Sequence, residues 1–267
     1  MSSKLIYILH NDNSHSVETA SYIKKRLTEE GYHIPKEFDE NAELIISIGG
    51  DGSFLGTLHS LGLPNIPIIS INTGHLGFFS EIKPDEIDTF VDKYMAGDFF
   101  IEQLSVMQAT ICTKDNCVGA KAINEIVIKG NKSRTVHLNI YVNNTLIQNF
   151  SGDGILVATS SGSTAYNYSA GGSIVDPSLD VLQVTPLSPI NTNAYRSFTS
   201  SVIFPSNTVI KVKPEYRFEN SIIIVSDGNE YRFADIEEVS LEYSPLKIRM
   251  LRLRDFNFWN RVIDKFL

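Results

Sequence analysis

A glycine-rich turn with one carboxylate, Gly-Gly-Asp-Gly-Ser, occupies residues 49–53. The apolar segment before it, residues 43–48, is typical of a buried strand of a parallel sheet, and residues 54–60 can continue as a helix. Open α/β sheets bind ligands at such turns, where glycines let the backbone approach and a helix start favours phosphate. Asp51 is costly there unless it meets a metal or takes a proton from a substrate. The alternative is a tight turn with a solvated carboxylate.

Glycines, hydroxyl side chains and a further carboxylate gather between residues 152 and 173. Gly152-Asp153-Gly154 precedes an expected strand at 155–159, and a helix is expected near 162–169. By the same argument this is a candidate ligand site. In its helix, Ser163 and Thr164 can donate hydrogen bonds to phosphate or ribose oxygens. Ala165 leaves room beside a planar ring, and Tyr166 can stack on one. The alternative is a Ser/Thr-capped helix packed by its tyrosine.

Two shorter motifs place polar side chains next to apolar runs. Asn124-Glu125 opens the run 126–128 and can hydrogen-bond a ribose or an adenine edge, although such residues more often only form turns. Asp227-Gly228 is typical of a hairpin turn. The six histidines lack metal-ligand spacing, and the sequence has no nucleophile elbow, zincin motif or Walker-type phosphate loop.

The composition, 42% hydrophobic and 20% charged over 267 residues, is that of a globular protein with a sizeable core. A formal net charge of −8 argues against a general nucleic-acid or anionic-membrane binder, but it leaves room for a local basic pocket that takes a phosphorylated ligand. Cys112 and Cys117 can pair in principle, and two reduced structural thiols are the favoured interpretation. The first apolar segment is too short for a signal peptide, and no run approaches the roughly 20 residues that span a membrane. We therefore expect a cytoplasmic protein.

Strand and helix patterns alternate up to about residue 100, which is typical of a parallel sheet with right-handed crossovers. The expected strands are 5–9, 44–48 and 67–71. The first expected helix has an apolar stripe of Ala20, Ile23 and Leu27 and ends at Gly31. The second begins at Pro84, has an apolar stripe of Ile87, Phe90, Val91 and Tyr94, and ends at Gly97. From Phe99 to about Leu251, short β-like runs between turn residues predict an antiparallel, β-rich domain. Residues 255–267 predict a short aromatic-rich amphipathic helix that docks on a domain.

Together these motifs resemble those of the NAD kinase family in type, order and spacing. They are GGDGS at 49–53, NTGHLGF at 72–78, NE at 124–125, and GDG at 152–154 followed by TSSGSTAYNYSAGG at 159–172. The segment Phe256-Asn-Phe-Trp259 is similar to the closing segment of Gram-positive bacterial members. GGDG also occurs in diacylglycerol-type lipid kinases and 6-phosphofructokinases, whereas GSTAY with its trailing Ala-Gly-Gly is far more specific.

The resemblance implies a fold and a reaction. The fold is an α/β N-terminal domain with a parallel sheet, formed by residues 1–100 with about 252–267, and an all-β, sandwich-like NAD-binding domain at 101–251. The C-terminal tail thus returns to the first domain. The reaction is phosphorylation of the 2′-hydroxyl of the adenosine ribose of NAD to give NADP, with ATP as donor and a divalent metal, Mg²⁺, carried by ATP. Homodimers or homotetramers are implied as well, with no nucleic-acid or membrane partner.

The resemblance also implies roles for individual residues. Asp51 accepts the proton of the 2′-hydroxyl, and Gly50 and Gly52 bring backbone close to the phosphates. Asn124 and Glu125 bind the ribose and nicotinamide side. The other implied NAD contacts are Phe78, Asp153, Ser163, Thr164, Ala165, Tyr166 and Ser169.

Two positions depart from the family pattern. Ser160 stands where many members have proline, which loosens a turn and removes no chemistry. Ser151 stands where close bacterial relatives often have an arginine, so any phosphate contact made by such an arginine is either absent here or supplied by another residue, such as Arg134 or Arg196. Two other functions fit parts of the pattern. A kinase of lipid or sphingoid hydroxyls predicts an apolar groove or membrane association, and a non-catalytic NADP(H) sensor predicts binding without turnover.

Overall fold

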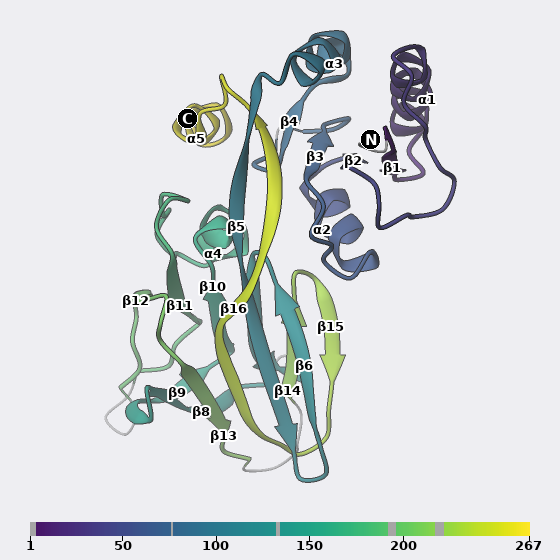
Figure 1. Cartoon of the computed structure of the whole chain (residues 1–267). Helices are drawn as coiled ribbons and strands as arrows, with labels where there is room; N and C mark the ends of the chain where they lie inside the picture. The colour runs from purple at the N-terminus through teal and green to yellow at the C-terminus, as the bar shows by residue number, and fades with distance from the viewer. Residues whose placement is uncertain (1–3, 76, 132–133, 192–195, 217–221) are drawn as a thin grey trace. The chain divides into compact units, whose positions relative to one another are not determined.

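The computed structural model of the chain describes residues 4–75, 77–131, 134–191, 196–216 and 222–267 (Figure 1). These residues form two compact units. The first comprises the chain up to Leu104 together with Lys247–Leu267, and the second comprises Ser105–Leu246. The strands β5 (Phe99–Thr113) and β16 (Ile236–Leu253) contribute residues to both units.

Parallel strands form the sheet of the first unit. β1 pairs with β2 and β2 with β3, while β4 and the C-terminal part of β16 both pair with β3, at different residues. The bounds are β1 Ile6–His10, β2 Leu44–Ile48, β3 Ile68–Ile71 and β4 Ser80–Ile82, with helices α1 Ser14–Glu29, α2 Asp51–Ser60, α3 Ile87–Ala96 and α5 Phe258–Phe266. The strands are short, Ile-rich and buried on both faces, as a parallel sheet covered by helices requires.

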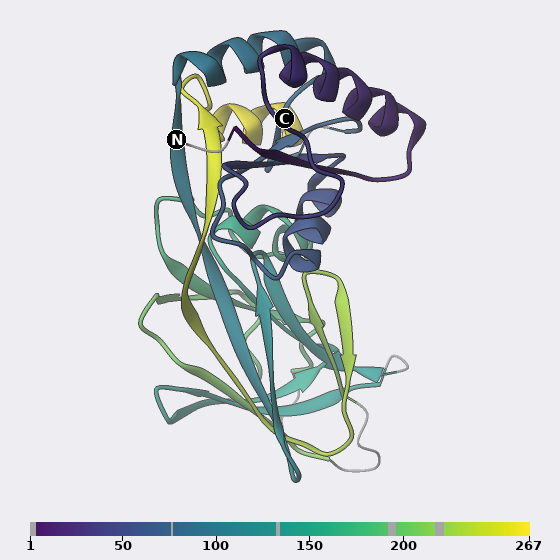
Figure 2. The same cartoon turned by 45° about the vertical axis from the view of Figure 1, so that its right-hand side comes forward.

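Side-chain alternation along β2 decides which helix covers which face of this sheet. Ile46 shares an apolar core with Ile23 of α1 and Phe90 of α3. Ser47 points to the opposite face, where its hydroxyl hydrogen-bonds Thr57 of α2 at 3.0 Å. Figure 2 accordingly shows α1 and α3 together on one side of the sheet and α2 on the other. α2 therefore starts at the carboxyl end of β2 and packs back along the sheet.

The expected helix ends are confirmed, and two local expectations need correction. Gly31 and Gly97 follow α1 and α3 with φ of +83° and +71°, a conformation that glycine adopts without strain. The chain at Pro84 first forms a 3₁₀ turn, Pro84–Glu86, and α3 begins only at Ile87. β4 was not predicted, because three residues are too few to display a period.

The second unit is a sandwich of two layers around one apolar core. One layer is a six-stranded sheet in the order β12–β11–β10–β7–β14–β15, and each pair of neighbouring strands in it is antiparallel. β5 pairs with β6 and β16, and β16, β13, β8 and β9 pair in that order. The strands are β6 Cys117–Ala122, β7 Glu125–Gly130, β8 Val136–Val142, β9 Thr145–Gly152, β10 Gly154–Ala158, β11 Val181–Leu187, β12 Val202–Pro205, β13 Ile210–Pro214, β14 Ile222–Ser226 and β15 Asn229–Arg232. Buried residues from both layers, such as Ile128 and Leu138, meet in the shared core.

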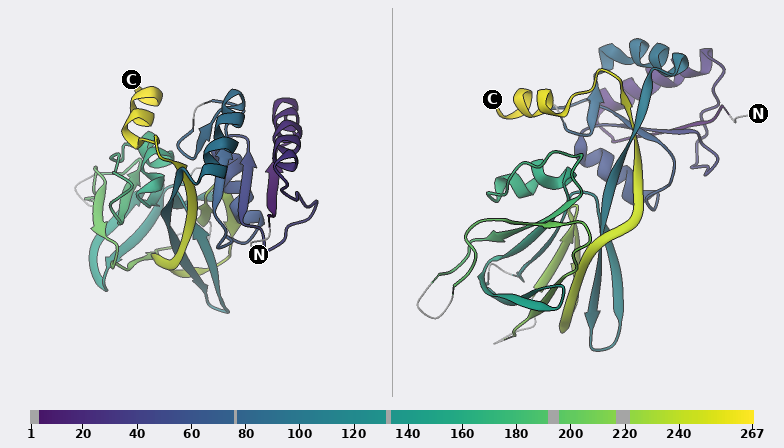
Figure 3. Two further views of the ribbon diagram at one scale, coloured as in Figure 1. Left: turned by 45° about the horizontal axis from the view of Figure 1, so that its top comes forward. Right: turned by 60° about the vertical axis from the view of Figure 1, so that its left-hand side comes forward.

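One short helical segment interrupts these strands. It consists of a 3₁₀ turn, Ser161–Thr164, and α4, Tyr166–Ser169, where the sequence predicts a helix. Figure 3 shows α4 among the strands of the second unit from two further sides. The predicted fold class, an α/β unit that contains the C-terminal tail and an all-β, sandwich-like unit, is confirmed.

The expectation of two reduced cysteines is wrong for this structure, in which Cys112 and Cys117 form a disulfide. The physical reason is their register. They lie opposite each other at the end of the antiparallel β5–β6 pair, with Cα atoms 4.1 Å apart. Sequence separation alone does not reveal that the hairpin closes at this pair.

The Asp227-Gly228 prediction is confirmed, because these residues form the two-residue turn between β14 and β15, with φ of +45° and +86°. The expected docking of the C-terminal helix is confirmed too. Phe258 and Phe266 of α5 pack against Phe78 within the first unit, with ring centroids 5.8 Å apart in both pairs. In the NTGHLGF motif, Leu76 lies outside the described residues. No helix in the described part of the chain is long and apolar enough to cross a membrane.

Candidate active site

Asp51 is the first residue of α2 and is held by backbone amides instead of by solvent. Its Oδ2 accepts from the N–H of Phe78 at 2.8 Å, and its Oδ1 accepts from Phe79 at 3.0 Å and Ser80 at 3.3 Å. A carboxylate has about four acceptor positions, so these three bonds leave about one for another donor. These bonds disfavour the alternative, a tight turn with a merely solvated aspartate, although Asp51 is only partly buried. The three backbone amides stabilise the Asp51 carboxylate, so its position in the turn does not require a metal or a substrate proton.

Two features of the first unit bring the amides of residues 78–80 against Asp51. A Cβ on Gly77 would lie 2.1 Å from Asp51 Oδ1, so only glycine permits this approach. The carbonyl of Phe78 accepts from the Nη1 and Nη2 atoms of Arg252, both at 3.4 Å. Arg252 is 4% exposed and also pairs with Glu81 at 2.9 Å and Glu102 at 2.7 Å. The loop that holds Asp51 is thus anchored to a buried ion-pair cluster.

The other predicted residues of the first unit fall into two groups. Gly50 and Gly52 lie at the start of α2, and a Cβ on either would meet no described atom within 4 Å. The backbone at this helix start is thus open to a close approach. Phe78 is 8% exposed, its ring packs on α5, and Lys265 lies over it at 5.0 Å. Its backbone, which holds Asp51, is the part of Phe78 nearest the predicted chemistry.

In the second unit, Asn124 and Glu125 are buried with unused hydrogen-bonding atoms. They are 6% and 9% exposed, and Asn124 Oδ1 and Glu125 Oε2 have no partner among the described residues. A buried polar atom without a partner costs free energy, so these atoms indicate a position for a ligand. The interpretation as mere turn residues is disfavoured.

Asp227, in the hairpin turn, holds the Asn124-Glu125 segment in place. Its Oδ2 accepts from the N–H of Ile123 at 2.7 Å, and its Oδ1 accepts from Asn124 at 2.8 Å and Glu125 at 3.2 Å. The N–H of Asp227 in turn donates to the carbonyl of Glu125 at 3.1 Å. Sequence analysis missed this role, because the Asp-Gly pair indicates only a turn.

We expect Asp227→Asn to weaken binding of NAD, the dinucleotide that the resemblance implies as ligand, about tenfold, because an amide has one oxygen where the carboxylate uses two to accept from three N–H groups. Asparagine tolerates the left-handed backbone at φ +45°, so the turn itself survives. Steady-state kinetics check this: KM for NAD rises while KM for ATP does not. Asp235→Asn, at another left-handed aspartate with φ +54°, is the control. Equal effects of the two variants would contradict a positioning role for Asp227.

The electrostatic setting of Glu125 is unusual. Burial, followed by the nearby charge of Asp227, raises the pKa of Glu125 to about 8, against a hydrogen bond from the backbone of Tyr166. Glu125 is therefore protonated at neutral pH in the free protein. Its O–H can donate as well as accept, which suits a ribose hydroxyl.

This pKa predicts a pH dependence of stability. The folded protein keeps the Glu125 proton up to about pH 8, whereas the unfolded chain loses it near the ordinary glutamate pKa of 4.5. Stability from this group is complete below the lower value and is lost with rising pH, by about 1.4 kcal/mol per pH unit within that window. Glu125→Gln removes this pH-dependent contribution to the free energy of unfolding, because a glutamine side chain does not titrate. Urea titrations should give equal unfolding free energies near pH 4.5 and a more stable variant near pH 8, and a constant difference across this range would contradict the raised pKa.

The GSTAY segment lies against Asn124. A Cβ on Gly162 would lie 2.1 Å from the carbonyl oxygen of Asn124, so the 3₁₀ turn and the Asn124 backbone touch. Thr159 ties the two further, because its hydroxyl donates to Ile123 at 2.5 Å and its N–H donates to Asn124 at 2.9 Å. These contacts bring two motifs together that lie more than 30 residues apart in the sequence.

The side chains of this segment differ in their access to a ligand. Ser163 is fully buried, and its hydroxyl bonds both the carbonyl and the N–H of Val175. Thr164 is 8% exposed, and Ala165 is half-buried. Tyr166 is 47% exposed, so it does not pack the helix. The Thr159 hydroxyl accepts from the N–H of Gly162 at 3.1 Å, so a threonine does cap the start of the 3₁₀ turn. Of the alternative, a capped helix packed by its tyrosine, the packing is therefore disfavoured and the cap is present.

A cavity of about 700 Å³ in the second unit collects several predicted residues. Asp153, Tyr166 and Ser169 line it, together with Lys129, Arg134 and Arg232. No group of three histidine, cysteine, aspartate or glutamate side chains that could hold a metal occurs in the described residues. A metal that arrives bound to a substrate phosphate does not require such a group.

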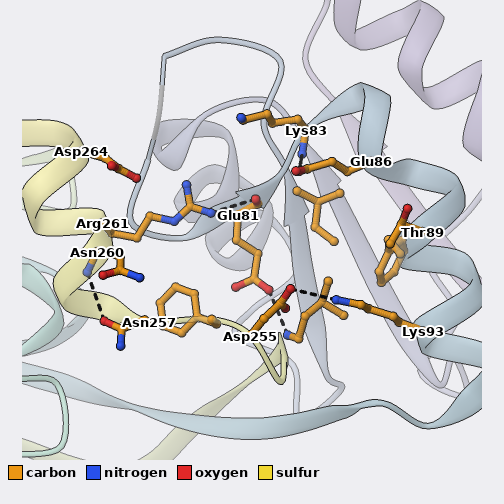
Figure 4. A pocket seen from close by; sticks show the side chains of 14 residues that line it. Glu81, Lys83, Glu86, Thr89, Lys93, Asp255, Asn257, Asn260, Arg261 and Asp264 are labelled. Atoms are coloured by element: carbon orange, nitrogen blue, oxygen red, sulfur yellow. Dashed lines mark hydrogen bonds and ion pairs between the residues drawn. The ribbon is translucent and has the colours of Figure 1, made fainter.

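The first unit contains a separate cavity of about 420 Å³, between β4, α3 and the chain around α5 (Figure 4). Several of its charged side chains pair with their surroundings: Lys93 bonds Asp255 at 2.9 Å, and Arg261 donates to the carbonyl of Glu81 at 2.9 Å. None of the predicted site residues is among the described residues that line it. We therefore assign it no part in the site.

A helix start with a fixed carboxylate on a parallel sheet, and a glycine- and hydroxyl-rich segment on a β-sandwich, together define a phosphate-handling protein of mixed α/β and β architecture. The ATP-NAD kinase N-terminal domain matches residues 1–99, and the ATP-NAD kinase C-terminal domain matches residues 123–253. The chain belongs to the NAD kinase family, whose members are phosphotransferases.

Curated relatives agree with this assignment, and solved structures share the fold. An NAD kinase of Finegoldia magna is 40% identical over 99% of this chain and 98% of its own length. NAD kinase 1 of Listeria innocua is 34% identical over 86% of this chain and 88% of its own. Among solved structures, yeast NADH kinase complexed with NADH has a TM-score of 0.84 at 20% identity, covering 98% of this chain and 86% of that one. An NAD kinase from Archaeoglobus fulgidus in complex with ATP has a TM-score of 0.77 at 22% identity, covering 98% of both chains.

Proposed function

We propose that this protein transfers the γ-phosphoryl group of Mg-ATP to the 2′-hydroxyl of the adenosine ribose of NAD, giving NADP, with Asp51 as proton acceptor. The observation that carries the proposal is Asp51 itself. It is fixed by three backbone N–H groups at the start of α2, where the helix end and nearby glycines suit phosphate.

Phosphoryl transfer demands alignment and charge neutralisation more than covalent help from the protein. A ribose hydroxyl is too weakly acidic to ionise at neutral pH. A carboxylate within about 2.6–3.2 Å of it orients the hydroxyl and takes its proton late in the transfer. The three amides hold Asp51 in one orientation and leave about one acceptor position for the hydroxyl. Mg²⁺, arriving with ATP, offsets the charge of the triphosphate.

The proposal gives the residues of the second unit a binding role. Unpaired atoms of Asn124 and Glu125 would bind ribose hydroxyls and the nicotinamide side, and exposed Tyr166 would stack on a planar ring. Thr164 and Ala165 would border that ring, and the other contacts would come from Phe78, Asp153 and Ser169. Ser163, bonded to Val175, supports the segment from behind. A cytoplasmic location and assembly as homodimers or homotetramers belong to the same proposal.

A coupled assay tests the proposal. Purified protein, Mg-ATP and NAD are incubated with excess NADP-specific glucose-6-phosphate dehydrogenase and its sugar substrate, and absorbance of the reduced product is followed. Signal that needs both ATP and NAD supports the proposal. Binding of NAD or NADP without turnover from any nucleoside triphosphate or polyphosphate would replace it with a sensor function. Turnover of a lipid hydroxyl but not of NAD would replace it with lipid phosphorylation.

A further inference from the structure

A row of residues across the six-stranded sheet places two cations on one face. Register pairs Lys129 of β7 with Ile223 of β14, and Ile223 with Arg232 of β15. Residues opposite each other on adjacent strands project to the same face, so these three side chains share one. Adjacent strands lie about 4.8 Å apart, so the backbones of Lys129 and Arg232 are roughly 10 Å apart with Ile223 between them. All three line the 700 Å³ cavity.

This face is the outer face of the sheet. The neighbours that alternate with the row, such as Ile128 and Ile224, point into the sandwich core. Val127 and Leu187 instead share the outer face with the row, where Ala170 packs against them. Ala170 directly follows α4, which contributes Tyr166 and Ser169 to the cavity wall. The cavity thus lies between the cationic row and the segment that carries the predicted stacking tyrosine.

A third cation reaches the same cavity from the turn after β7. The backbones of Gly130 and Arg134 touch, since a Cβ on Gly130 would lie 2.0 Å from the Arg134 carbonyl oxygen. The lining therefore has three cationic side chains, of Lys129, Arg134 and Arg232, against one anionic side chain, Asp153. In a chain of net charge −8, this local excess is opposite in sign to the whole. Such a cavity favours an anion that also carries a planar ring.

We propose that Lys129, Arg134 and Arg232 form the subsite for the diphosphate of the dinucleotide, a proposal that rests on the proposed function. Arginine forks bind phosphate oxygens in pairs, and lysine adds a point charge. Arg232 also pairs with Glu230 on its own strand. Ser151 cannot contribute, because it is 1% exposed and its hydroxyl bonds the ring of His137 at 2.6 Å. The subsite thus takes its positive charge from Lys129 and Arg232 of the sheet row and from Arg134.

The test uses Lys129→Gln and Arg232→Gln, singly and together, with Lys114→Gln as control. Lys114 is exposed, does not line the cavity, and undergoes the same loss of charge. Calorimetry measures binding of NAD and of a bis-nucleoside in which an uncharged linker replaces the diphosphate. We expect each cavity variant to weaken NAD binding about tenfold or more, as loss of a charge-assisted hydrogen bond does. The uncharged analogue should bind both cavity variants as it binds the unchanged protein.

The salt dependence of NAD binding is the second measurement, because each lost phosphate contact should flatten it. Unchanged NAD affinity in the double variant, or equal losses for NAD and the uncharged analogue, would overturn the subsite. Failure of the subsite and failure of the proposed function are distinguishable. Charge-dependent NAD binding without turnover in the coupled assay would reject the kinase activity and keep the subsite. Turnover that the cavity variants leave unchanged would keep the kinase activity and reject the subsite.

Discussion

Asp51→Asn is expected to lower kcat for NADP formation by about 10²–10⁴-fold while NAD still binds. The substitution keeps the size of the side chain and removes its ability to accept a proton. Because the nucleotide is held by residues of the second unit in this proposal, loss of the carboxylate should leave the Kd for NAD within about twofold. The coupled assay gives kcat, and calorimetry gives Kd.

The structure adds a cost that the experiment must separate from catalysis. Asparagine has one oxygen, so its NH₂ group must face an N–H donor of Phe78, Phe79 or Ser80. Loss of such a bond costs about 1–3 kcal/mol, so the kinetics are measured well below the melting temperature. Asp39→Asn is a matched control, because Asp39 also accepts a backbone N–H, from Asn41 at 2.8 Å, in an exposed turn. Near-normal kcat in a folded Asp51→Asn protein would remove Asp51 from the proton-acceptor role.

Arg252→Met is expected to lower the free energy of unfolding by about 3–5 kcal/mol, because removal of one partner leaves buried charge uncompensated. Glu81 is 8% exposed and bonds Arg252 and the N–H of Leu253. Burial raises the pKa of Glu81, and the arginine opposes that rise. Without Arg252 the pKa rises further, so the loss of stability should grow with pH from the acid range towards neutrality.

Two further variants separate the buried pair from a general loss of charge. Arg254→Met makes the same change two residues on, in an arginine whose side chain is 66% exposed and pairs with Asp98, and it should cost less than about 1 kcal/mol. Glu81→Gln combined with Arg252→Met should recover part of the stability, since the more deeply buried of the two carboxylates that Arg252 pairs with then carries no charge, and only Glu102 is left without its partner. Urea titrations measure all of them. Equal losses for the two arginine variants would contradict the importance of the buried cluster.

The same cluster links stability to activity. Arg252 bonds the Phe78 carbonyl, and the amides of residues 78–80 hold Asp51. Arg252→Lys keeps the charge in this cluster, and we expect it to retain more kcat than Arg252→Met when both are measured in the folded state. KM for NAD should stay nearly constant in both, because the change acts on the orientation of the carboxylate.

Local pattern was sufficient for most elements of the fold. Alternation and apolar stripes located β1, β2, β3, α1 and α3, and glycine conformation set the helix ends at Gly31 and Gly97. The Asp227-Gly228 turn was predicted because this residue pair tolerates the left-handed backbone that a two-residue hairpin turn needs, and both residues have positive φ. These features depend on interactions within a few residues, which is why the sequence reveals them. The positions of the two candidate ligand-binding turns, after β2 and around β10, likewise follow from local sequence.

What each site residue does depended on contacts across the chain. Asp51 is bonded by amides 27 to 29 residues away, and Asp227 by amides 102 to 104 residues away. No local pattern encodes such pairs. Register likewise decided that Cys112 and Cys117 meet, and that Lys129 and Arg232 flank one row of the sheet.

The sequence by itself thus determined the class of fold, the positions of the candidate ligand-binding turns and the family, because glycines, short apolar strands and hydroxyl clusters act locally. The tertiary structure alone decided that Asp51 is held by amides, that Ser163 faces inward and that Arg252 anchors the loop that holds Asp51. Those outcomes depend on which backbone groups the folded sheets bring within hydrogen-bonding distance.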